Sequence, residues 1–163
     1  MEWLFKEYEE LTLSELYELL KLRASVFVIE QDCLYQDLDG KDSQATHLLG
    51  YKKKLIAYSR IFPPGTIDKE HARIGRIITR KQYRGKGIGF KLVKKSVSFC
   101  KERFGNKIIK ISAQLYLKKF YNQCGFVEKG KIYLEDGIPH CFMYLNPALQ
   151  SYWSGPESPE SNS

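Results

Sequence analysis

Apolar and polar positions alternate along some segments of the chain and recur every three to four residues along others. Alternating or continuous apolar residues predict strands at 3–8, 47–51, 55–62, 74–79 and 108–113, with two more around 126–133 and 140–145. Helical spacing predicts helices at 13–28, 90–104 and 115–124, and a capping box of Thr12 and Glu15 opens the first. The predicted order is therefore β-α-β-β-β-α-β-α-β-β.

The length of 163 residues allows one substantial hydrophobic core, so we expect one domain over residues 1–150. Residues 151–163 are rich in Ser, Pro and Glu and are expected to form a flexible tail. No apolar run approaches the roughly 20 residues that a membrane helix needs, and the N-terminus lacks a signal-peptide pattern. We therefore expect a cytoplasmic protein that does not bind a membrane.

Charge is strongly segregated along the chain, which has a formal net charge of +7. Residues 72–101 carry basic side chains and no acidic one, so this segment suits an anion. Residues 30–42, called the acidic loop below, are expected to lie at the surface, either as a solvated loop or as a site that attracts a protonated amine. Nucleic acid is not an expected partner, because aromatic side chains are not interleaved with the basic ones as stacking platforms.

No metal is expected. The cysteines are scattered without a Cys-x-x-Cys pair, which argues against zinc and redox motifs and favours buried thiols. The acidic loop contains Asp37-x-Asp39-Gly-x-Asp42, but it lacks the terminal Glu of a calcium loop.

A glycine-rich segment lies between the predicted strand at 74–79 and the helix that follows. Its residues are Arg84, Gly85, Lys86, Gly87, Ile88 and Gly89. Glycines at a helix N-terminus let backbone N–H groups approach phosphate oxygens, where the helix dipole adds partial positive charge. The spacing matches neither a Walker loop nor the dinucleotide fingerprint, whose third Gly is replaced by Phe90. An anion site is predicted, with an ordinary glycine-rich helix entry as the alternative.

Several motifs in order carry a resemblance to a known family. Arg-x-x-Gly-x-Gly at 84–89 resembles the Gln/Arg-x-x-Gly-x-Gly/Ala signature of the GNAT superfamily of N-acetyltransferases, and 121–126 resembles their Tyr-x-x-x-Gly-Phe element. The segments similar to the ElaA-like group of that superfamily are 26–31, 35–42 and 135–140. The resemblance covers residues 16 to about 145. It implies an α/β (α+β) fold, a single domain with a mixed, mainly antiparallel twisted sheet flanked by helices.

The same resemblance implies that acetyl-coenzyme A lies across a V-shaped gap between two parallel strands. Backbone groups of Ile77, Ile78 and Thr79 would pair with the pantetheine arm as an added strand does, and the loop at 84–89 would hold the pyrophosphate. Gln114, at the end of the neighbouring predicted strand, occupies a place where such enzymes often present a polar side chain to the cofactor. A plain strand terminus is an equally good interpretation of Gln114.

The implied reaction needs an uncharged amine to attack a thioester, an oxyanion to be stabilised and a thiolate to be protonated. Tyr121 matches the general-acid position, and a backbone N–H near Ile78 is the expected oxyanion donor. Covalent catalysis by Cys33 or Cys124 is a minor option, because neither has an activating partner visible in the sequence. Candidates for the general base are left open, with Glu30 and His140 put forward as catalytic residues beside Asp37, Glu135 and Asp136.

The acceptor is expected to be a small-molecule or peptide amine that binds near Asp37, Asp39, Glu135 and Asp136. Two other classes of function stay open. One is a non-catalytic acyl-coenzyme A-binding or interaction module. The other is an acyltransferase similar to acyl-homoserine lactone synthases, which Arg23-x-x-x-Phe27 followed by the acidic loop faintly resembles. The sequence identifies neither the acceptor nor the oligomeric state, and a homodimer is one option.

Overall fold

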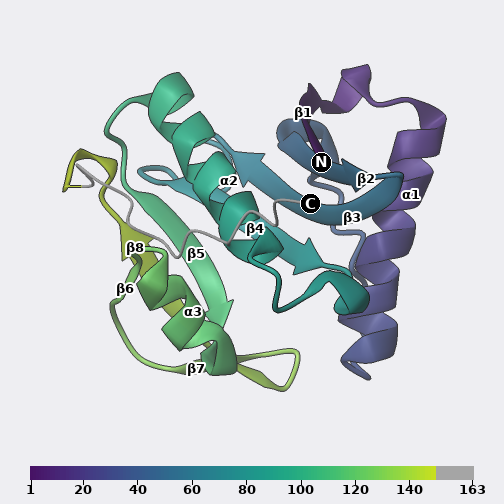
Figure 1. The fold of residues 1–163 in the computed structure, drawn as a ribbon. Coiled ribbons are helices and arrows are strands. Elements are labelled where there is room, and N and C mark those ends of the chain that lie inside the picture. The colour runs from purple at the N-terminus through teal and green to yellow at the C-terminus, as the bar shows by residue number, and fades with distance from the viewer. Residues whose placement is uncertain (150–163) are drawn as a thin grey trace, which may run out of the picture.

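Strands and helices alternate along the computed structural model of the chain, which describes residues 1–149 (Figure 1). The strands are β1 (Glu2–Glu7), β2 (Thr46–Lys52), β3 (Lys54–Phe62), β4 (Ala72–Thr79), β5 (Ile109–Gln114), β6 (Val127–Glu128), β7 (Tyr133–Glu135) and β8 (Ile138–Leu145). The helices are α1 (Leu13–Arg23), α2 (Ile88–Phe104) and α3 (Lys118–Gln123). The tail expected at 151–163 lies outside the described residues.

The order of strands and helices predicted from the sequence is confirmed from β1 to α3. Two details differ: the end of the first helix and the region after α3. Helix α1 ends at Arg23, and the segment Ala24–Glu30 continues it as a π-helix. The prediction of a single strand at 126–133 is wrong, because two short strands, β6 and β7, occupy this region. Gly130, between them, has a φ of 100°, a left-handed conformation that interrupts an extended strand.

One eight-stranded sheet contains the strands in the order β1-β2-β3-β4-β5-β8-β6, with β7 paired to β8. Within residues 1–149 every strand pair is antiparallel except β4–β5. The expected mixed, mainly antiparallel sheet is therefore confirmed.

Strands β4 and β5 separate soon after they begin. Their parallel pairing is limited to residues 72–73 against 109–110. Beyond it, β4 continues against β3 alone, and the β3–β4 register shifts between Tyr58 and Arg60. Arg76, near this shift, has a φ of 50°, as expected of a β-bulge that bends a strand. As a result, β4 and β5 diverge towards their carboxyl ends (Figure 1).

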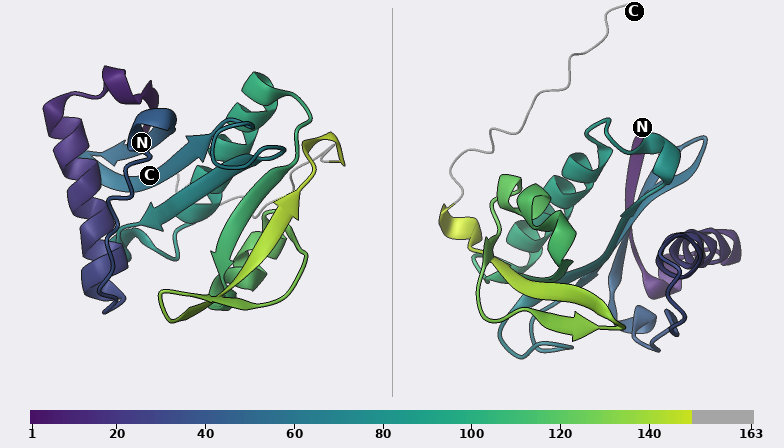
Figure 2. Two further views of the ribbon diagram at one scale, coloured as in Figure 1. Left: turned by 180° about the vertical axis from the view of Figure 1, so that it is seen from behind. Right: turned by 90° about the horizontal axis from the view of Figure 1, so that it is seen from below.

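Helices α2 and α3 cover one face of the sheet, and α1 covers the other face over β2 and β3 (Figure 2). The core under α2 includes Val93 and Val97 packed with Ile74 and Ile111. The core under α1 joins its buried residues to Leu49, Leu55, Tyr58 and Ile78. The described helices therefore leave one face of β5 and β8 without a helix over it. None of the helices within residues 1–149 has the length and apolar character needed to cross a membrane.

Candidate active site

Ile77, Ile78 and Thr79 form the end of β4, beyond the point where β5 has left it. On the β3 side, Ile78 pairs with Tyr58 and Thr79 pairs with Ala57. The opposite edge of this segment has no strand partner in the described chain. Backbone groups that point to an unpaired edge can bind an extended ligand as an added strand. The part that these three residues play in binding stays a prediction.

The glycine loop, residues 84–89, joins the end of β4 to α2. Gly85 has a φ of 72°, and Gly87, the N-cap residue of α2, has a φ of 71°. These left-handed values strongly favour glycine. A Cβ atom on Gly89 would lie 3.5 Å from Cζ of Phe120 and 3.7 Å from Oγ1 of Thr79. The end of β4, the start of α2 and the helix α3 therefore meet at Gly89.

The N-terminus of α2 has the properties of an anion site. No side chain of the described residues caps the helix, and its first backbone N–H groups have no acceptor within the helix itself. The dipole of this 17-residue helix adds partial positive charge at the same end. Arg84 Nε donates to the Thr79 carbonyl at 2.9 Å, and Lys86 Nζ donates to the Gln82 carbonyl at 3.3 Å. These contacts keep both cationic side chains next to the loop.

Glu30, one of the predicted bases, lies against this loop. Both terminal nitrogens of the Arg84 guanidinium donate to the Glu30 carboxylate, with Nη2 at 3.1 Å from Oε2. A carboxylate whose two oxygens both accept from a guanidinium is not free to reach a substrate amine. The geometry therefore does not favour Glu30 as the base, and it puts a negative charge on an arginine that a phosphate would also approach.

Tyr121 lies on α3 with its ring among other aromatic rings. The centroid distances are 5.1 Å to Phe120 and 6.1 Å to Phe126. Its side chain is 5% exposed, and burial, with smaller effects of Cys124 and Tyr116, raises the pKa of its hydroxyl. The phenol is protonated at neutral pH and is able to donate a hydrogen bond, and its burial makes it a weaker acid than a free tyrosine. Its role as general acid stays a prediction.

The cysteines do not form an activated nucleophile. Cys100, Cys124 and Cys141 are buried as expected, whereas Cys33 is only half-buried. Burial raises the pKa of the Cys124 thiol to about 12, so it is not a thiolate at neutral pH. Within residues 1–149 no group of His, Cys, Asp or Glu side chains is arranged to hold a metal ion.

The acidic loop lies at the surface, as expected, but two of its aspartates turn inward. Asp37 and Asp42 are buried, and a network of three arginines from α1, β3 and β4 binds the three aspartates. Its shortest contacts are Arg23–Asp37 at 2.7 Å, Arg23–Asp42 at 2.7 Å, Arg60–Asp39 at 2.6 Å, Arg60–Asp42 at 2.8 Å and Arg76–Asp37 at 2.7 Å. Because these carboxylates are already neutralised, the geometry gives little support to Asp37 and Asp39 as ligands of a cationic acceptor.

Glu135 and His140 lie close together on β7 and β8. Glu135 Oε2 lies 3.8 Å from His140 Nε2 and accepts a hydrogen bond of 2.9 Å from Ser112 Oγ. Ser112 Oγ is also 2.5 Å from the hydroxyl of Tyr133. His140 Nδ1 donates to the Ile138 carbonyl at 2.7 Å, so Nε2 is the nitrogen that faces Glu135. The structure therefore brings two of the predicted bases together with a serine and a tyrosine.

The segment after the π-helix reaches across to β5 and to the β7–β8 turn. The side-chain amides of Gln31 and Gln114 exchange hydrogen bonds of 3.0 and 3.3 Å. Cys33 Sγ lies 3.5 Å from the carbonyl of Asp136, which has a φ of 50° in the turn. Gln114, a predicted cofactor contact, is thus bonded to another side chain here. The roles of Gln114 and Asp136 stay predictions.

Three residues of this region were not candidates in the sequence: Gln31, Ser112 and Tyr133. Ser112 had a detectable signal, because it and Lys110 are the two polar positions of the predicted strand at 108–113 and lie two residues apart, on one face. Gln31 had none, because its partner Gln114 is 83 positions away. Contacts of that kind depend on the fold and not on local pattern.

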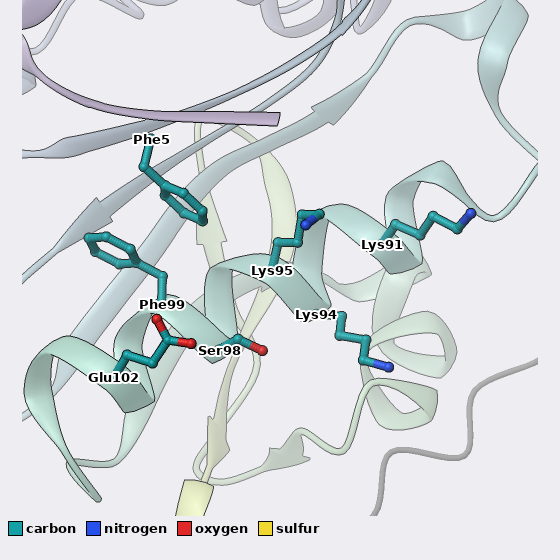
Figure 3. Close-up of a pocket in the computed structure, with 7 residues that line it drawn as sticks. All are labelled: Phe5, Lys91, Lys94, Lys95, Ser98, Phe99 and Glu102. Carbon is teal, nitrogen blue, oxygen red and sulfur yellow. The ribbon is translucent and has the colours of Figure 1, made fainter. Parts of the chain in front are cut away.

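A hollow of about 360 Å³ lies elsewhere, between β1 and the outer face of α2 (Figure 3). The rings of Phe5 and Phe99 face each other there, with centroids 4.6 Å apart. Lys91 and Lys95 line the hollow along α2. It contains neither the end of β4 nor the glycine loop, so we do not take it as the active site.

A mixed sheet with diverging parallel strands, followed by a glycine loop at a helix N-terminus, defines the class of protein. A family model described as an acetyltransferase (GNAT) domain matches residues 10–147. The chain belongs to this family of GNAT acetyltransferases.

Its relatives include ElaA. The Escherichia coli K12 protein ElaA is 41% identical over 146 residues, which are 88% of this chain and 95% of that protein. The crystal structure of Escherichia coli ElaA superposes with a TM-score of 0.84 at 40% identity, over 89% of this chain and 99% of that one. The structure of an acyl-CoA N-acyltransferase from Pseudomonas aeruginosa gives the same TM-score of 0.84 at 36% identity, with the same coverage of 89% and 99%. The resemblance and fold class expected from the sequence are therefore confirmed.

Proposed function

We propose that this protein transfers an acetyl group from acetyl-coenzyme A to an amine by direct attack in a ternary complex. One observation carries the proposal: the diverging end of β4, the glycine loop and α3 meet at Gly89. The unpaired edge of β4 suits the extended pantetheine arm, and the N-terminus of α2 suits the pyrophosphate. Membership of the GNAT family and the likeness to an acyl-CoA N-acyltransferase support the same donor.

In this proposal the donor contacts come from three places. Backbone groups of Ile77, Ile78 and Thr79 bind the pantetheine arm, and backbone groups of residues 85–89 bind the pyrophosphate. Arg84 and Lys86 add positive charge beside the phosphates. Gln114 contacts the donor once it leaves its partner Gln31.

The chemistry uses few side chains. The amine nitrogen forms a bond to the acetyl carbon, the resulting oxyanion accepts a hydrogen bond from a backbone N–H near Ile78, and the C–S bond then breaks. Tyr121 is protonated at neutral pH, as a phenol ordinarily is, so its hydroxyl donates to the sulfur as negative charge develops and then gives the thiolate its proton. The proton lost by the amine passes to a base, and Tyr121 regains one through solvent.

Glu135 and His140 are the proposed route for the amine proton. They face each other on the side of β5 away from α2, and neither is held by an arginine at hydrogen-bond distance. Glu30 and Asp37 differ in this respect, because guanidinium groups hold their carboxylates. This contrast favours Glu135 and His140 among the predicted bases.

Titration calorimetry with acetyl-coenzyme A, followed by an assay of coenzyme A thiol release on a panel of amines, tests the proposal. We expect binding heat and turnover. Tyr121→Phe should lower kcat by about 100-fold or more while leaving acetyl-coenzyme A affinity unchanged. The matched control is Tyr116→Phe, since Tyr116 is 72% exposed on the neighbouring turn. If neither heat nor thiol release is seen with any amine, the proposal is wrong.

Two alternatives have distinct outcomes in the same assays. Binding of acetyl-coenzyme A without turnover, unaffected by Tyr121→Phe, would favour a non-catalytic acyl-coenzyme A-binding module. Preference for long acyl chains over acetyl would favour the reaction class of acyl-homoserine lactone synthases. The cytoplasmic location and the homodimer stay predictions.

A further inference from the structure

The side of β5 and β8 away from α2 and α3 is an open polar face. Along β5, Ile109, Ile111 and Ala113 belong to the core, and along β8 the core residues are Cys141 and Met143. The residues between them point to the other side. We define the open face by Arg73, Lys110, Ser112, Gln114, Tyr133, Glu135, His140 and Phe142, which are linked by the contacts below.

Arg73 is a cation with unused donors on this face. Its nearest carboxylate is Asp68, at 3.8 Å from Nη1, and its buried Nε has no hydrogen-bond partner within residues 1–149. Asp68 is itself occupied by His71 Nδ1 at 2.9 Å and by Lys110 Nζ at 3.1 Å. Because the Asp68 carboxylate is already held by other side chains, the Arg73 guanidinium is able to bind an anionic group of a ligand.

Glu135 is an acceptor with unused capacity near Arg73. Its side chain is 50% exposed, and its one short contact within the described chain is the hydrogen bond from Ser112 at 2.9 Å. Phe142 and Tyr133 lie beside these charges, with ring centroids 4.7 Å apart. The Arg73 guanidinium carbon is 5.8 Å from the Phe142 centroid, and Lys110 Nζ lies over the same ring at 4.4 Å. A single small molecule next to Tyr133 would meet a cation and a carboxylate together.

Both charges lie near the hydroxyl of Tyr133. Burial raises the pKa of this hydroxyl, and among the smaller effects Glu135 raises it and Arg73 lowers it. Ser112, which donates to Glu135, lies two residues along β5 from Lys110, the strand partner of Arg73. A cation and a carboxylate therefore lie around one tyrosine on this face.

We infer that the acceptor is an amine that carries its own carboxylate, as an α-amino acid or a short homologue does; this inference rests on the proposed function. Arg73 binds the carboxylate, and Glu135 binds the amino group, close to His140. Simple polyamines do not fit, because the aspartates of the acidic loop are already neutralised by arginines. The expected acceptor is thus zwitterionic and not merely cationic.

The experiment compares each free amino acid of a panel with its own carboxamide, which keeps the side chain and the amine but lacks the carboxylate. Acetyl-coenzyme A is the donor, and thiol release gives kcat/KM. The wild-type protein should prefer the free acid by about 10- to 100-fold, as expected for a charged hydrogen-bonded contact. Arg73→Gln should remove this preference by raising KM for the acids far more than for the carboxamides, and Arg73→Lys should restore part of it.

Arg103→Gln is the matched control, because Arg103 is exposed at the end of α2 and should change neither substrate class. Thermal unfolding of each variant checks that folding is intact. Carboxamides or plain amines that are acetylated as well as the free acids by the wild type would overturn the inference and leave the proposed function standing. An Arg73→Gln protein that keeps the preference would also overturn it. Absence of thiol release and of binding heat would remove both proposals.

Discussion

Two regions on the sheet face away from α2 use arginine in opposite ways. Next to α1, Arg23 and Arg60 are almost fully buried, and each is held by two aspartates at 2.8 Å or less. On the open face over β5 and β8, Arg73 lies near one carboxylate at 3.8 Å that other side chains already occupy. The number of partners, and not the residue type, therefore separates a structural arginine from one that is available to a ligand.

The largest expected loss of stability comes from removing one of the buried arginines. Arg23→Ala removes a fully buried cation and leaves Asp37 and Asp42 without a main partner. Loss of one member of a buried ion pair typically costs about 3–5 kcal/mol of unfolding free energy. Urea unfolding followed by circular dichroism measures the change.

Arg73→Ala is the matched change on the open face. Because its guanidinium has no close ion pair, we expect a loss of unfolding free energy of about 1 kcal/mol or less. Equal destabilisation by the two variants would contradict the distinction between the two regions.

A smaller effect should appear in the pH dependence of stability. Burial acts to raise the pKa of Asp42, but the guanidiniums of Arg23 and Arg60 outweigh burial and hold the pKa below its ordinary value. A lowered carboxyl pKa contributes stability that is complete above the unfolded value of about 4 and is lost as pH falls through the folded value. Asp42→Asn should therefore destabilise the protein at pH 7, by roughly 1–3 kcal/mol.

The difference between wild type and Asp42→Asn should shrink as the pH is lowered below about 4. Thermal unfolding across pH 2–7 tests this convergence, with Asp136→Asn as the control in an exposed turn. A constant difference at all pH values would mean that the charge of Asp42 does not supply its stability.

The smallest expected effect is at a third arginine site, where the Glu30 carboxylate accepts hydrogen bonds from Arg84 next to the glycine loop. Glu30→Gln removes a charge that competes with phosphate for that guanidinium, so coenzyme A affinity should rise by about two- to five-fold, the scale of a partly exposed ion pair. Calorimetry measures the affinity, and thiol release should show an unchanged kcat. A large fall in kcat would instead identify Glu30 as the general base.

The glycine loop, the helices and most of the strands could be predicted from local sequence patterns, because neighbouring residues determine them. The glycine loop was readable because left-handed residues at a helix entry require glycine, and the structure gives Gly85 and Gly87 such a conformation. The strands and helices followed from periodicity in the same way. The split into β6 and β7 was not predicted, because a short interruption at Gly130 is weak against an apolar run.

The surroundings of the acidic loop and of Glu135 could not be predicted, because they depend on residues that are distant in the sequence. The sequence left open whether the aspartates of the acidic loop are solvated or attract a cation, because their arginines, in α1, β3 and β4, lie far from them in sequence. Ser112, Tyr133 and Glu135 come together only because β5 and β7 lie on either side of β8. Charge runs and periodicity do not indicate which distant strands pair with each other.

The binding of coenzyme A at the end of β4 and the glycine loop is tested most directly by titrating ¹⁵N-labelled protein with coenzyme A. The amide chemical shifts are measured at each step. We expect the largest shifts on residues 77–79 and 84–89, and little change at Arg23 and Asp42. Shifts centred on the hollow of Phe5 and Phe99, or no shifts at all, would contradict it.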